Sequence, residues 1–367
     1  MGEVAFVKEI SRVPLPFERS VMSTTTTTTS QQHQQHHHHD RIKKTSCGTK
    51  HSLILTRPHG VVYASGQSDE GQINQAGECI NTFTTIYRGA CYVKSIGKRS
   101  FVIDRESREL ILCGENHFCQ LGLGDSKNRV SWTIHPFFSK LKHEEGEFVT
   151  KVDGGISHTV VMTSKKRFFH FGMCFKLGEL SSHPCLLTLN HATISRVKCT
   201  HYATFYWTTS QKMYASGLND LKQLPGISKN IVIPMYSPVL ITKFVHLAEN
   251  GDFIQDVLGG SNYTCFITHK GLVYICGAQF DNGENIMDEP QLLENPFRRN
   301  CDDRFKFRTL DETCELFCTG TSLFALNNVN KFTHSFKEML FKMSKRREHE
   351  YSNRCLDVTF IFENEQV

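Results

Sequence analysis

Histidine and serine residues that lie close together are the first candidates for chemistry in this chain. Gly155-Ile156-Ser157-His158 begins like the nucleophile elbow of hydrolases, but Thr159 stands where that motif needs its second glycine. The sequence also lacks a glycine-rich phosphate loop and a dinucleotide fingerprint on a strand–helix unit. We therefore expect no catalytic residue and no cofactor-binding residue, and we predict that the protein is not an enzyme.

His51 and His158 could also act as general bases. Each lies three residues after the second residue of a small-residue turn, at the same place of a segment that recurs along the chain. A residue whose position is fixed by a repeat is better explained by structure than by catalysis at one site. We expect both histidines to hydrogen-bond the backbone of their own structural unit.

The sequence gives little support for a metal site. Its 14 cysteines are scattered, and Cys314 and Cys318 lie four residues apart without partner ligands. A polar tract over residues 21–40 contains six threonines and ends in four histidines, and we expect it to be a disordered insert. We predict no metal ligands and no cofactor.

Composition limits the compartment and the partners. No apolar leader precedes the cysteines, so Cys47, Cys113, Cys265 and Cys276 are interpreted as reduced, buried thiols of a cytoplasmic or nuclear protein. No segment approaches the length of a transmembrane helix. The 42 Lys and Arg against 37 Asp and Glu give a net charge of +5, which is too small to indicate nucleic acid as the main partner.

One segment recurs five times and sets the architecture. Each copy opens with a small-residue turn, continues with an apolar run and closes on a glycine, namely Gly66, Gly114, Gly172, Gly217 and Gly277. The closing glycine follows the second turn residue by 18 positions in the first copy and by 17 in the other four. A fixed spacing inside a variable period is typical of a repeated structural unit with loops of different length.

The copies read as strands. His51–Thr56 and Leu272–Cys276 are rich in β-branched and aromatic residues and are bounded by glycine and polar breakers. A unit of about 50 residues with several short strands fits a four-stranded propeller blade. A β-sandwich would explain the strands but not the fixed spacing. We therefore predict an all-β propeller of about six four-stranded blades, five of them clear and one degenerate.

A second motif follows three of the closing glycines. Gln72-Ile73, Gln120-Leu121 and Gln223-Leu224 each begin six residues after their glycine. Together with the turn and the histidine, this motif resembles the regulator of chromosome condensation repeat family over about residues 41–297. His51 and His158 match the family's histidine, whereas Ser100, Ala203 and Tyr263 stand at that place in the other copies. The resemblance implies a propeller, usually of seven blades.

The five clear blades are expected at about 41–90, 91–146, 147–190, 191–246 and 250–298, within a propeller that spans 41–330. Arg308–Leu310, Glu315–Cys318 and Ser322–Leu326 are expected as three strands of the degenerate sixth blade, which lacks an outer strand. A strand at Val13–Phe17, within an N-terminal segment over 1–20, is expected to complete that blade, because an open edge strand is a liability that propellers remove.

The C-terminal part changes character. Ser335-Phe336-Lys337-Glu338 forms a capping box, and apolar residues then follow at helical spacing. We predict a linker over 331–351 whose helix, at about 335–350, is the only helix of the chain. The alternating segment Asp357–Glu363, within 355–367, resembles the opening strand of a BTB (POZ) domain, which would be truncated here.

Two functions fit these patterns. The first is a non-catalytic protein-interaction scaffold related to propeller–BTB adaptors of cullin ubiquitin ligases, with an unknown protein partner on one propeller face. Cullin binding is expected only for a form with a complete BTB domain. The alternative is a guanine-nucleotide exchange factor for a Ran-like small GTPase, or a chromatin-binding protein, as the resemblance to the repeat family implies.

Overall fold

Strands form most of the regular secondary structure in the part of the chain that the computed structural model describes. The described residues are 41–75, 77–173, 180–189, 192–228, 232–233, 237–278, 286–292, 314–318 and 323–327. Their strands form five antiparallel sheets of four or five strands and one sheet of two strands. The prediction of an all-β propeller with five clear blades is confirmed.

Each sheet is one blade, and its strands follow the order of the chain. Blade 1 contains β1 (Arg41–Cys47), β2 (His51–Arg57), β3 (Val62–Ser68) and β4 (Gly77–Tyr87). Blade 2 contains β5 (Ala90–Ile96), β6 (Arg99–Asp104), β7 (Leu110–Gly114) and β8 (Arg129–Ile134). Blade 3 contains β9 (Val149–Gly154), β10 (His158–Thr163), β11 (Phe168–Met173) and β12 (Leu180–Leu186).

The fourth blade has a divided outer strand. It contains β13 (Ile194–Cys199), β14 (Ala203–Thr208), β15 (Met213–Leu218), β16 (Val232–Ile233) and β17 (Val239–Leu240), and both of the last two pair with β15. Blade 5 contains β18 (Ile254–Gly259), β19 (Tyr263–Thr268), β20 (Val273–Ala278) and β21 (Ile286–Leu292).

The degenerate sixth blade is represented by a hairpin. β22 (Cys314–Cys318) and β23 (Leu323–Asn327) pair in antiparallel register, with Cys314 opposite Asn327. Several expected segments lie outside the described residues. They are the closing strand at Val13–Phe17, the polar tract over 21–40, the sixth-blade strand Arg308–Leu310, the helix at 335–350 and the BTB-like strand Asp357–Glu363.

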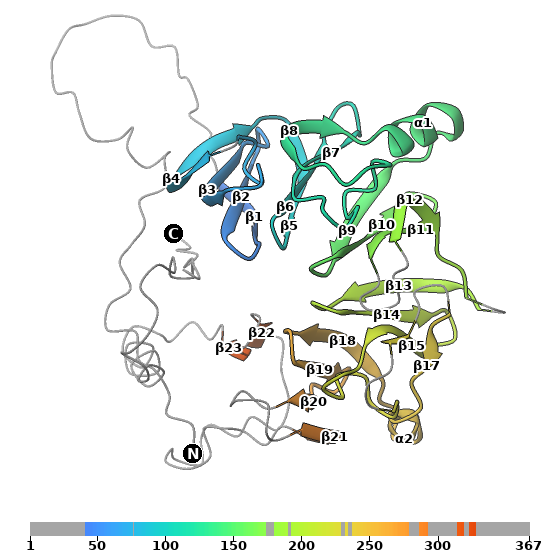
Figure 1. Cartoon of the computed structure of the whole chain (residues 1–367). Helices are drawn as coiled ribbons and strands as arrows, with labels where there is room; N and C mark the ends of the chain where they lie inside the picture. Colours follow the sequence, from blue (N-terminus) through green and yellow to red (C-terminus); the bar gives the residue numbers. More distant parts are fainter. Residues whose placement is uncertain are drawn as a thin grey trace, which may run out of the picture.

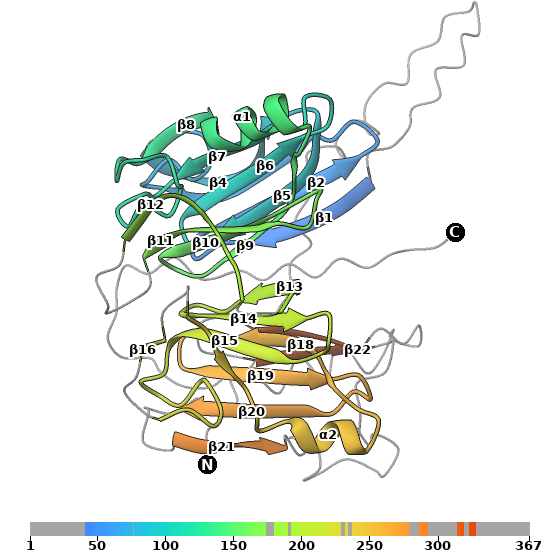
Figure 2. The same ribbon diagram turned by 90° about the vertical axis from the view of Figure 1, so that its right-hand side faces the viewer.

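The blades follow one another around a common centre, with the first strand of each nearest to it (Figure 1). Along the series β1, β5, β9, β13 and β18, each first strand contacts that of the next blade. Viewed from the side, the strands of all blades lie roughly along one axis, and neighbouring strands of a blade point in opposite directions (Figure 2). The turns between first and second strands therefore gather on one end of the propeller, which we call the turn face.

Apolar side chains fill the space between neighbouring blades. One core cluster joins blades 2 and 3 and includes Phe101 and Phe171, both fully buried. Another joins blades 4 and 5, where the rings of Phe205 and Phe266 meet edge to face with centroids 5.5 Å apart. These contacts arise because alternate residues of a strand point to opposite faces of its sheet, and both faces are covered by a neighbouring blade.

The closing glycines explain the fixed spacing in the sequence. Gly172 pairs with His158 and has a φ of 100°, a region that favours glycine. A Cβ atom there would lie 2.3 Å from the carbonyl oxygen of Ser157. The third strand can approach the second this closely only if no side chain is present at the closing position.

The prediction that helix is confined to 335–350 is wrong. Helix α1 (Pro136–Glu145) follows blade 2, and the short helix α2 (Val245–Glu249) follows blade 4. Proline at the first position suits a helix start, and Gly146 ends α1 in the left-handed conformation with φ 63°. The ring of Phe138 packs 5.7 Å from that of Phe169, so α1 covers the apolar joint between blades 2 and 3.

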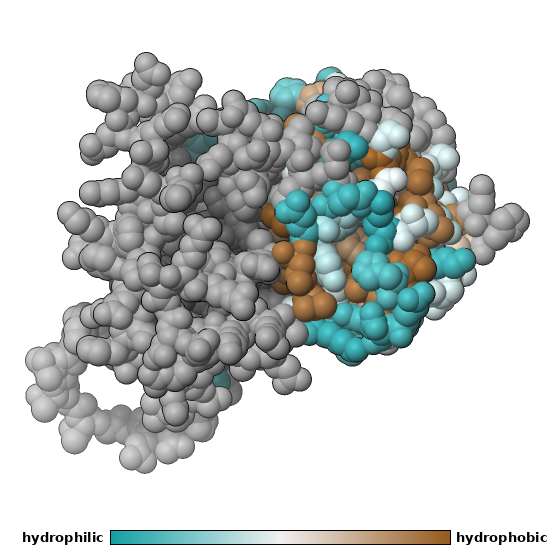
Figure 3. All heavy atoms as spheres, turned by 90° about the horizontal axis from the view of Figure 1, so that it is seen from below, coloured by the Kyte–Doolittle hydropathy of each residue, from teal (hydrophilic) through white to brown (hydrophobic). Residues whose placement is uncertain are grey.

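The outer side of blades 4 and 5 mixes apolar and polar surface. Figure 3 views the molecule from below Figure 1, the side of α2 and β21, where hydrophobic and hydrophilic side chains are interleaved. The exposed large hydrophobic residues of these blades are Val239, Leu240, Val245 and Leu292. Among the described residues, neither helix has the length and apolar character needed to cross a bilayer.

Candidate interaction site

One position in the second strand is equivalent in all five blades, and in blades 1, 2 and 3 its side chain hydrogen-bonds the next blade. It is the residue paired with the closing glycine, namely His51, Arg99, His158, Ala203 and Tyr263. In blades 2 to 5 the residue after it carries a hydroxyl group, as Ser100, Thr159, Thr204 and Thr264. We call a hydrogen bond from this position to the hydroxyl of the following blade an inter-blade clasp.

Both sequence-predicted histidines form such clasps. The Nε2 atom of His51 lies 2.9 Å from the Ser100 hydroxyl, and that of His158 lies 2.9 Å from the Thr204 hydroxyl. Burial lowers the pKa of His51 to about 4 and that of His158 to about 3, so both rings are neutral near pH 7. Their partners are hydroxyl groups of the next blade, whereas the sequence analysis expected the backbone of the same blade.

The structure does not bring Ser157 and His158 together as a nucleophile and its base. The Ser157 hydroxyl donates a hydrogen bond to the Met173 carbonyl oxygen at 3.1 Å, and the His158 ring points to Thr204. Both residues are buried. A serine activated by a histidine requires a direct hydrogen bond between the two side chains.

Arg99 forms the third clasp, and the sequence analysis missed it. Its guanidinium donates to the Thr159 hydroxyl at 2.9 Å and to the Ile156 carbonyl oxygen at 3.1 Å, both in blade 3. The side chain is fully buried, and burial lowers its pKa, while the carboxylate of Glu115 raises it. Counting from the turn had placed Ser100 at the histidine position, but the pairing with Gly114 assigns that position to Arg99.

The joint between blades 4 and 5 has no clasp. Ala203 cannot donate, and the Thr264 hydroxyl is buried without a hydrogen-bond partner among the described residues. The residue in the turn before the second strand explains why alanine rather than histidine occupies the clasp position in blade 4. In blade 3 the His158 ring occupies the space beside Gly155, where a Cβ atom would lie 2.5 Å from its Cε1 atom. Blade 4 has Thr200 at that turn position, so a side chain already stands where the ring would lie.

The glutamine motif builds three loops on the turn face, which we call the glutamine loops (67–75, 115–128 and 219–228). In each of them the side-chain oxygen of the glutamine accepts a hydrogen bond from the amide two residues earlier, at 2.7 to 3.0 Å. Asn116 and Asn219 accept from Leu121 and Leu224, both at 2.8 Å. These internal bonds fix the loop backbones, so the motif is structural.

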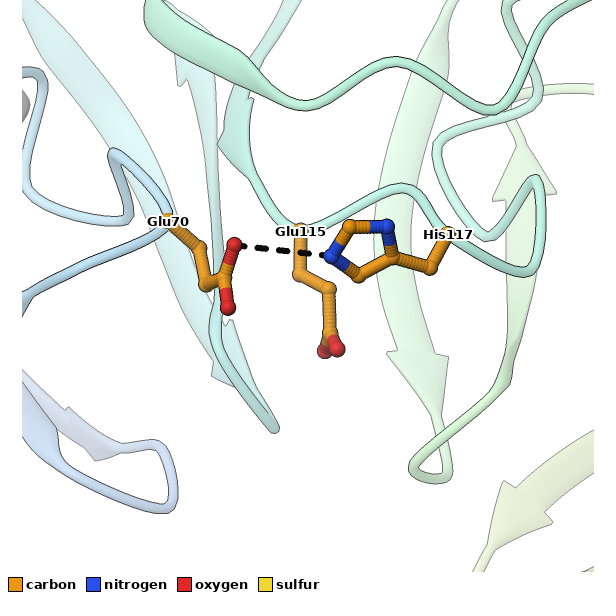
Figure 4. A group of neighbouring side chains, drawn as sticks. All are labelled: Glu70, Glu115 and His117. Atoms are coloured by element: carbon orange, nitrogen blue, oxygen red, sulfur yellow. Dashed lines mark ion pairs between the residues drawn. The ribbon is translucent and has the colours of Figure 1, made fainter.

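Glu70, Glu115 and His117 meet where the first two glutamine loops lie side by side (Figure 4). In the described ranges they form the one group of three potential ligands, with ligand atoms within 4.8 Å of one another. Glu70 already has an ammonium partner, because Lys98 lies 3.2 Å from one of its oxygens. The other oxygen accepts from Asn128 and lies 3.6 Å from the His117 ring. A cation at this place would compete with Lys98, so we assign the group to loop positioning.

The cysteines depart in part from expectation. Nine of the cysteines in the described ranges are free, and Cys113, Cys265 and Cys276 are buried as predicted. Cys47, however, is exposed at the end of β1. The first strand has no blade strand on its inner edge, which leaves alternate side chains of β1 accessible.

Comparison with curated proteins shows similarity to propeller-containing proteins of different size. The chain is 26% identical over 240 residues to the probable E3 ubiquitin-protein ligase HERC4 of Rattus norvegicus, covering 61% of this chain and 21% of HERC4. It is 24% identical over 273 residues to the ultraviolet-B receptor UVR8 of Arabidopsis thaliana, covering 69% of this chain and 58% of the receptor. The chain thus spans only part of each relative. No protein-family model matches the sequence.

Solved structures agree on the fold. Human WBSCR16 superposes with a TM-score of 0.61 at 16% identity, covering 78% of this chain and 72% of that one. Prp20p of Saccharomyces cerevisiae, also called yeast RCC1, superposes with a TM-score of 0.57 at 14% identity, covering 82% and 71%. Identity this low shows the fold alone. Taken with the repeated closing glycines and the glutamine loops, it makes this chain an RCC1-like β-propeller.

Proposed function

We propose that the chain is a non-catalytic protein-interaction module that binds its partner on the turn face. The main support is that the side chains best suited to chemistry make contacts that hold the propeller together. The buried histidines and Arg99 hold neighbouring blades together, and Glu70 positions two loops. A buried side chain that is held by a contact between blades is poorly placed to act on a substrate.

The glutamine loops suit a binding role. Binding residues often lie on loops that a rigid scaffold positions, and loops already ordered before binding lose less conformational entropy. Exposed charged groups, including Lys50, Asp69 and Lys127, project from this face between the fixed loop backbones. The two curated relatives are named as a ubiquitin ligase and a light receptor, so the similarity follows the propeller rather than one shared reaction.

A surface exchange experiment tests the proposal. The full chain and two charge-reversal variants, Lys50→Glu/Lys127→Glu on the turn face and Lys166→Glu/Lys212→Glu on the opposite face, serve as baits in quantitative affinity capture. We expect the turn-face variant to lose the partners that the wild type retains, while the other variant keeps them. Loss of the partners only in the Lys166/Lys212 variant would contradict the assignment of the face.

A second assay separates this proposal from the nucleotide-exchange alternative, which the fold likeness to yeast RCC1 favours. Nucleotide release from Ran-like and Rho-like GTPases should proceed at the same rate with and without the protein. A clear acceleration would replace the scaffold proposal by the exchange function. A BTB-type link to a cullin belongs to the proposal only for a longer form with a complete BTB domain.

A further inference from the structure

The first strands of the five blades contain a marked excess of positive charge. Two rows of equivalent positions run across them, one formed by Lys44, Tyr92, Lys151, Arg196 and Asp256, and the other by Ser46, Lys94, Asp153, Lys198 and Leu258. The two rows hold five cations and two carboxylates. Because these strands surround the centre of the propeller, the excess charge is concentrated near its axis (Figure 1).

Both carboxylates are already paired. Asp153 lies 2.9 Å from Lys94 and also accepts the Cys199 amide at 2.9 Å. Asp256 lies 2.6 Å from Arg196 and 3.6 Å from Lys198. No carboxylate of the described residues lies within ion-pair distance of Lys44 or Lys151. The unbalanced charge therefore lies on β1 and β9, on either side of Tyr92 in β5.

The surroundings of Lys44 gather several ammonium groups around one aromatic ring. Its ammonium lies 3.7 Å above the Tyr92 ring, and Lys43 reaches the Cys91 carbonyl oxygen beside it at 2.8 Å. Burial and the nearby charges of Lys94, Lys151 and Lys43 lower the pKa of Lys44 to about 8, although Asp153 opposes them. Several ammonium groups that repel one another around an aromatic ring form a site complementary to a multivalent anion.

We propose that Lys44 and Lys151, on either side of Tyr92, form a binding site for a small polyphosphate or phosphate ester near the propeller axis. Lys43 contributes further positive charge from β1, whereas the charge of Lys94 is balanced by Asp153. The Tyr92 hydroxyl donates to the Val152 carbonyl oxygen at 2.9 Å, so the ring between the two lysines is held in place. This site is separate from the turn-face loops and does not depend on the proposed protein interaction.

Isothermal titration of the full chain with tripolyphosphate tests the site. We expect saturable binding that becomes about fivefold weaker or more in Lys44→Met and in Lys151→Met, since each removes one ammonium contact. Lys212→Met, which removes an exposed lysine of a distant hairpin, should bind like the wild type. Lys151 is exposed, so its variant tests the site even if Lys44→Met folds poorly. Equal losses in all three variants, or no saturable binding, would overturn the proposal.

Proton uptake gives a second readout. At pH 9 a large share of Lys44 is unprotonated, so a bound anion should draw a proton onto it, whereas little uptake should occur at pH 7. The other titratable groups facing Lys44 are Lys43, Tyr92, Lys94, Lys151 and Asp153. Titrations in buffers of different ionisation enthalpy measure the uptake. Uptake at pH 9 that persists in Lys44→Met would contradict the assignment to this lysine.

Discussion

Two joints between blades differ in their polar contacts, namely the joint between blades 2 and 3 and the joint between blades 4 and 5. Both contain an aromatic layer, with Phe101 and Phe171 in the first and Phe205 and Phe266 in the second. Only the first adds a buried polar clasp, from Arg99 to Thr159. In the second, Ala203 faces the buried Thr264 hydroxyl without a hydrogen bond.

This difference separates the contribution of apolar packing from that of the clasp, which occur together in the joint between blades 2 and 3. Blade 4 packs against blade 5 through its apolar layer and through polar contacts elsewhere in the joint. The Trp207 indole donates to the Ile254 carbonyl oxygen at 2.8 Å, and Arg196 pairs with Asp256. A clasp is therefore not required for a blade to pack. A buried hydroxyl without a partner still costs about 1–3 kcal/mol. We infer that the clasps add stability and fix the relative position of blades whose contact is already apolar.

Removal of the Arg99 clasp should have the largest effect. Arg99→Ala leaves a cavity and several unpaired carbonyl oxygens in blade 3, and we expect it to lower the free energy of unfolding by about 3 kcal/mol or more. Arg99→His, which restores the residue type of blades 1 and 3, should recover part of the loss. Urea unfolding measures both. Wild-type stability in Arg99→Ala would show that desolvation of the guanidinium cancels its hydrogen bonds.

The histidine clasps should make the propeller sensitive to acid. His51 and His158 are neutral in the fold, with pKa values of about 4 and 3, but take up protons below about pH 6.5 when the chain unfolds. Their contribution is present above pH 6.5 and is lost as pH falls, by about 1.4 kcal/mol per pH unit for each histidine.

The comparison of unfolding at pH 7 and pH 5 checks this. His51→Gln/His158→Gln should show a flatter pH dependence than the wild type, because glutamine does not titrate. His143→Ala, which changes an exposed histidine of α1, should keep the wild-type slope. An unchanged slope in the double variant would assign the acid sensitivity to other groups.

The missing clasp should be restorable. In Thr200→Gly/Ala203→His the glycine makes room for the ring, and the imidazole can bond the Thr264 hydroxyl, so we expect a gain of about 1 kcal/mol. Ala203→His alone should destabilise, because Thr200 occupies the space of the ring. Thermal unfolding of both variants is the measurement. If the double variant is less stable than the single one, the glycine is not what admits the ring.

The smallest effect is expected at the loop ion pairs. Glu70→Gln keeps an acceptor for Asn128 but removes the charge that faces Lys98, which retains Asp69 as a partner at 3.0 Å. We expect a loss of about 0.5–1 kcal/mol that shrinks at high salt. Unfolding in low and high salt measures it. A larger, salt-independent loss would mean that Glu70 acts through packing rather than charge.

Much of the fold could be predicted from the sequence because strand pairing imposes a fixed distance between paired residues. The closing glycines predicted five blades for this reason. Helix α1 escaped prediction because Pro136, Phe137 and Phe138 were taken as part of a blade, whereas its apolar residues cover the joint from outside. The clasp position of blade 2 was missed because its hairpin is longer. One more residue separates the clasp residue from the closing glycine than in blades 3 to 5, so the pairing with Gly114 places Arg99 rather than Ser100 at this position.

The site was less predictable than the fold. A sequence shows that His51 and His158 occupy equivalent places, but their hydroxyl partners lie in the next blade, 46 or 49 residues away. The glutamine motif was recognised without its role, because its hydrogen bonds return to the backbone of its own loop. The charge on the first strands becomes evident only when strands from five blades are brought together around one axis.

The closing glycines also bear on how such a chain can diverge. All five keep a backbone conformation with φ between 100° and 120°, and at each a Cβ atom would collide with a carbonyl oxygen of the neighbouring strand. The clasp residue has meanwhile become histidine, arginine, alanine or tyrosine in different copies. The side chains of a duplicated unit can therefore change at most positions, whereas the closing position stays glycine because a side chain does not fit there.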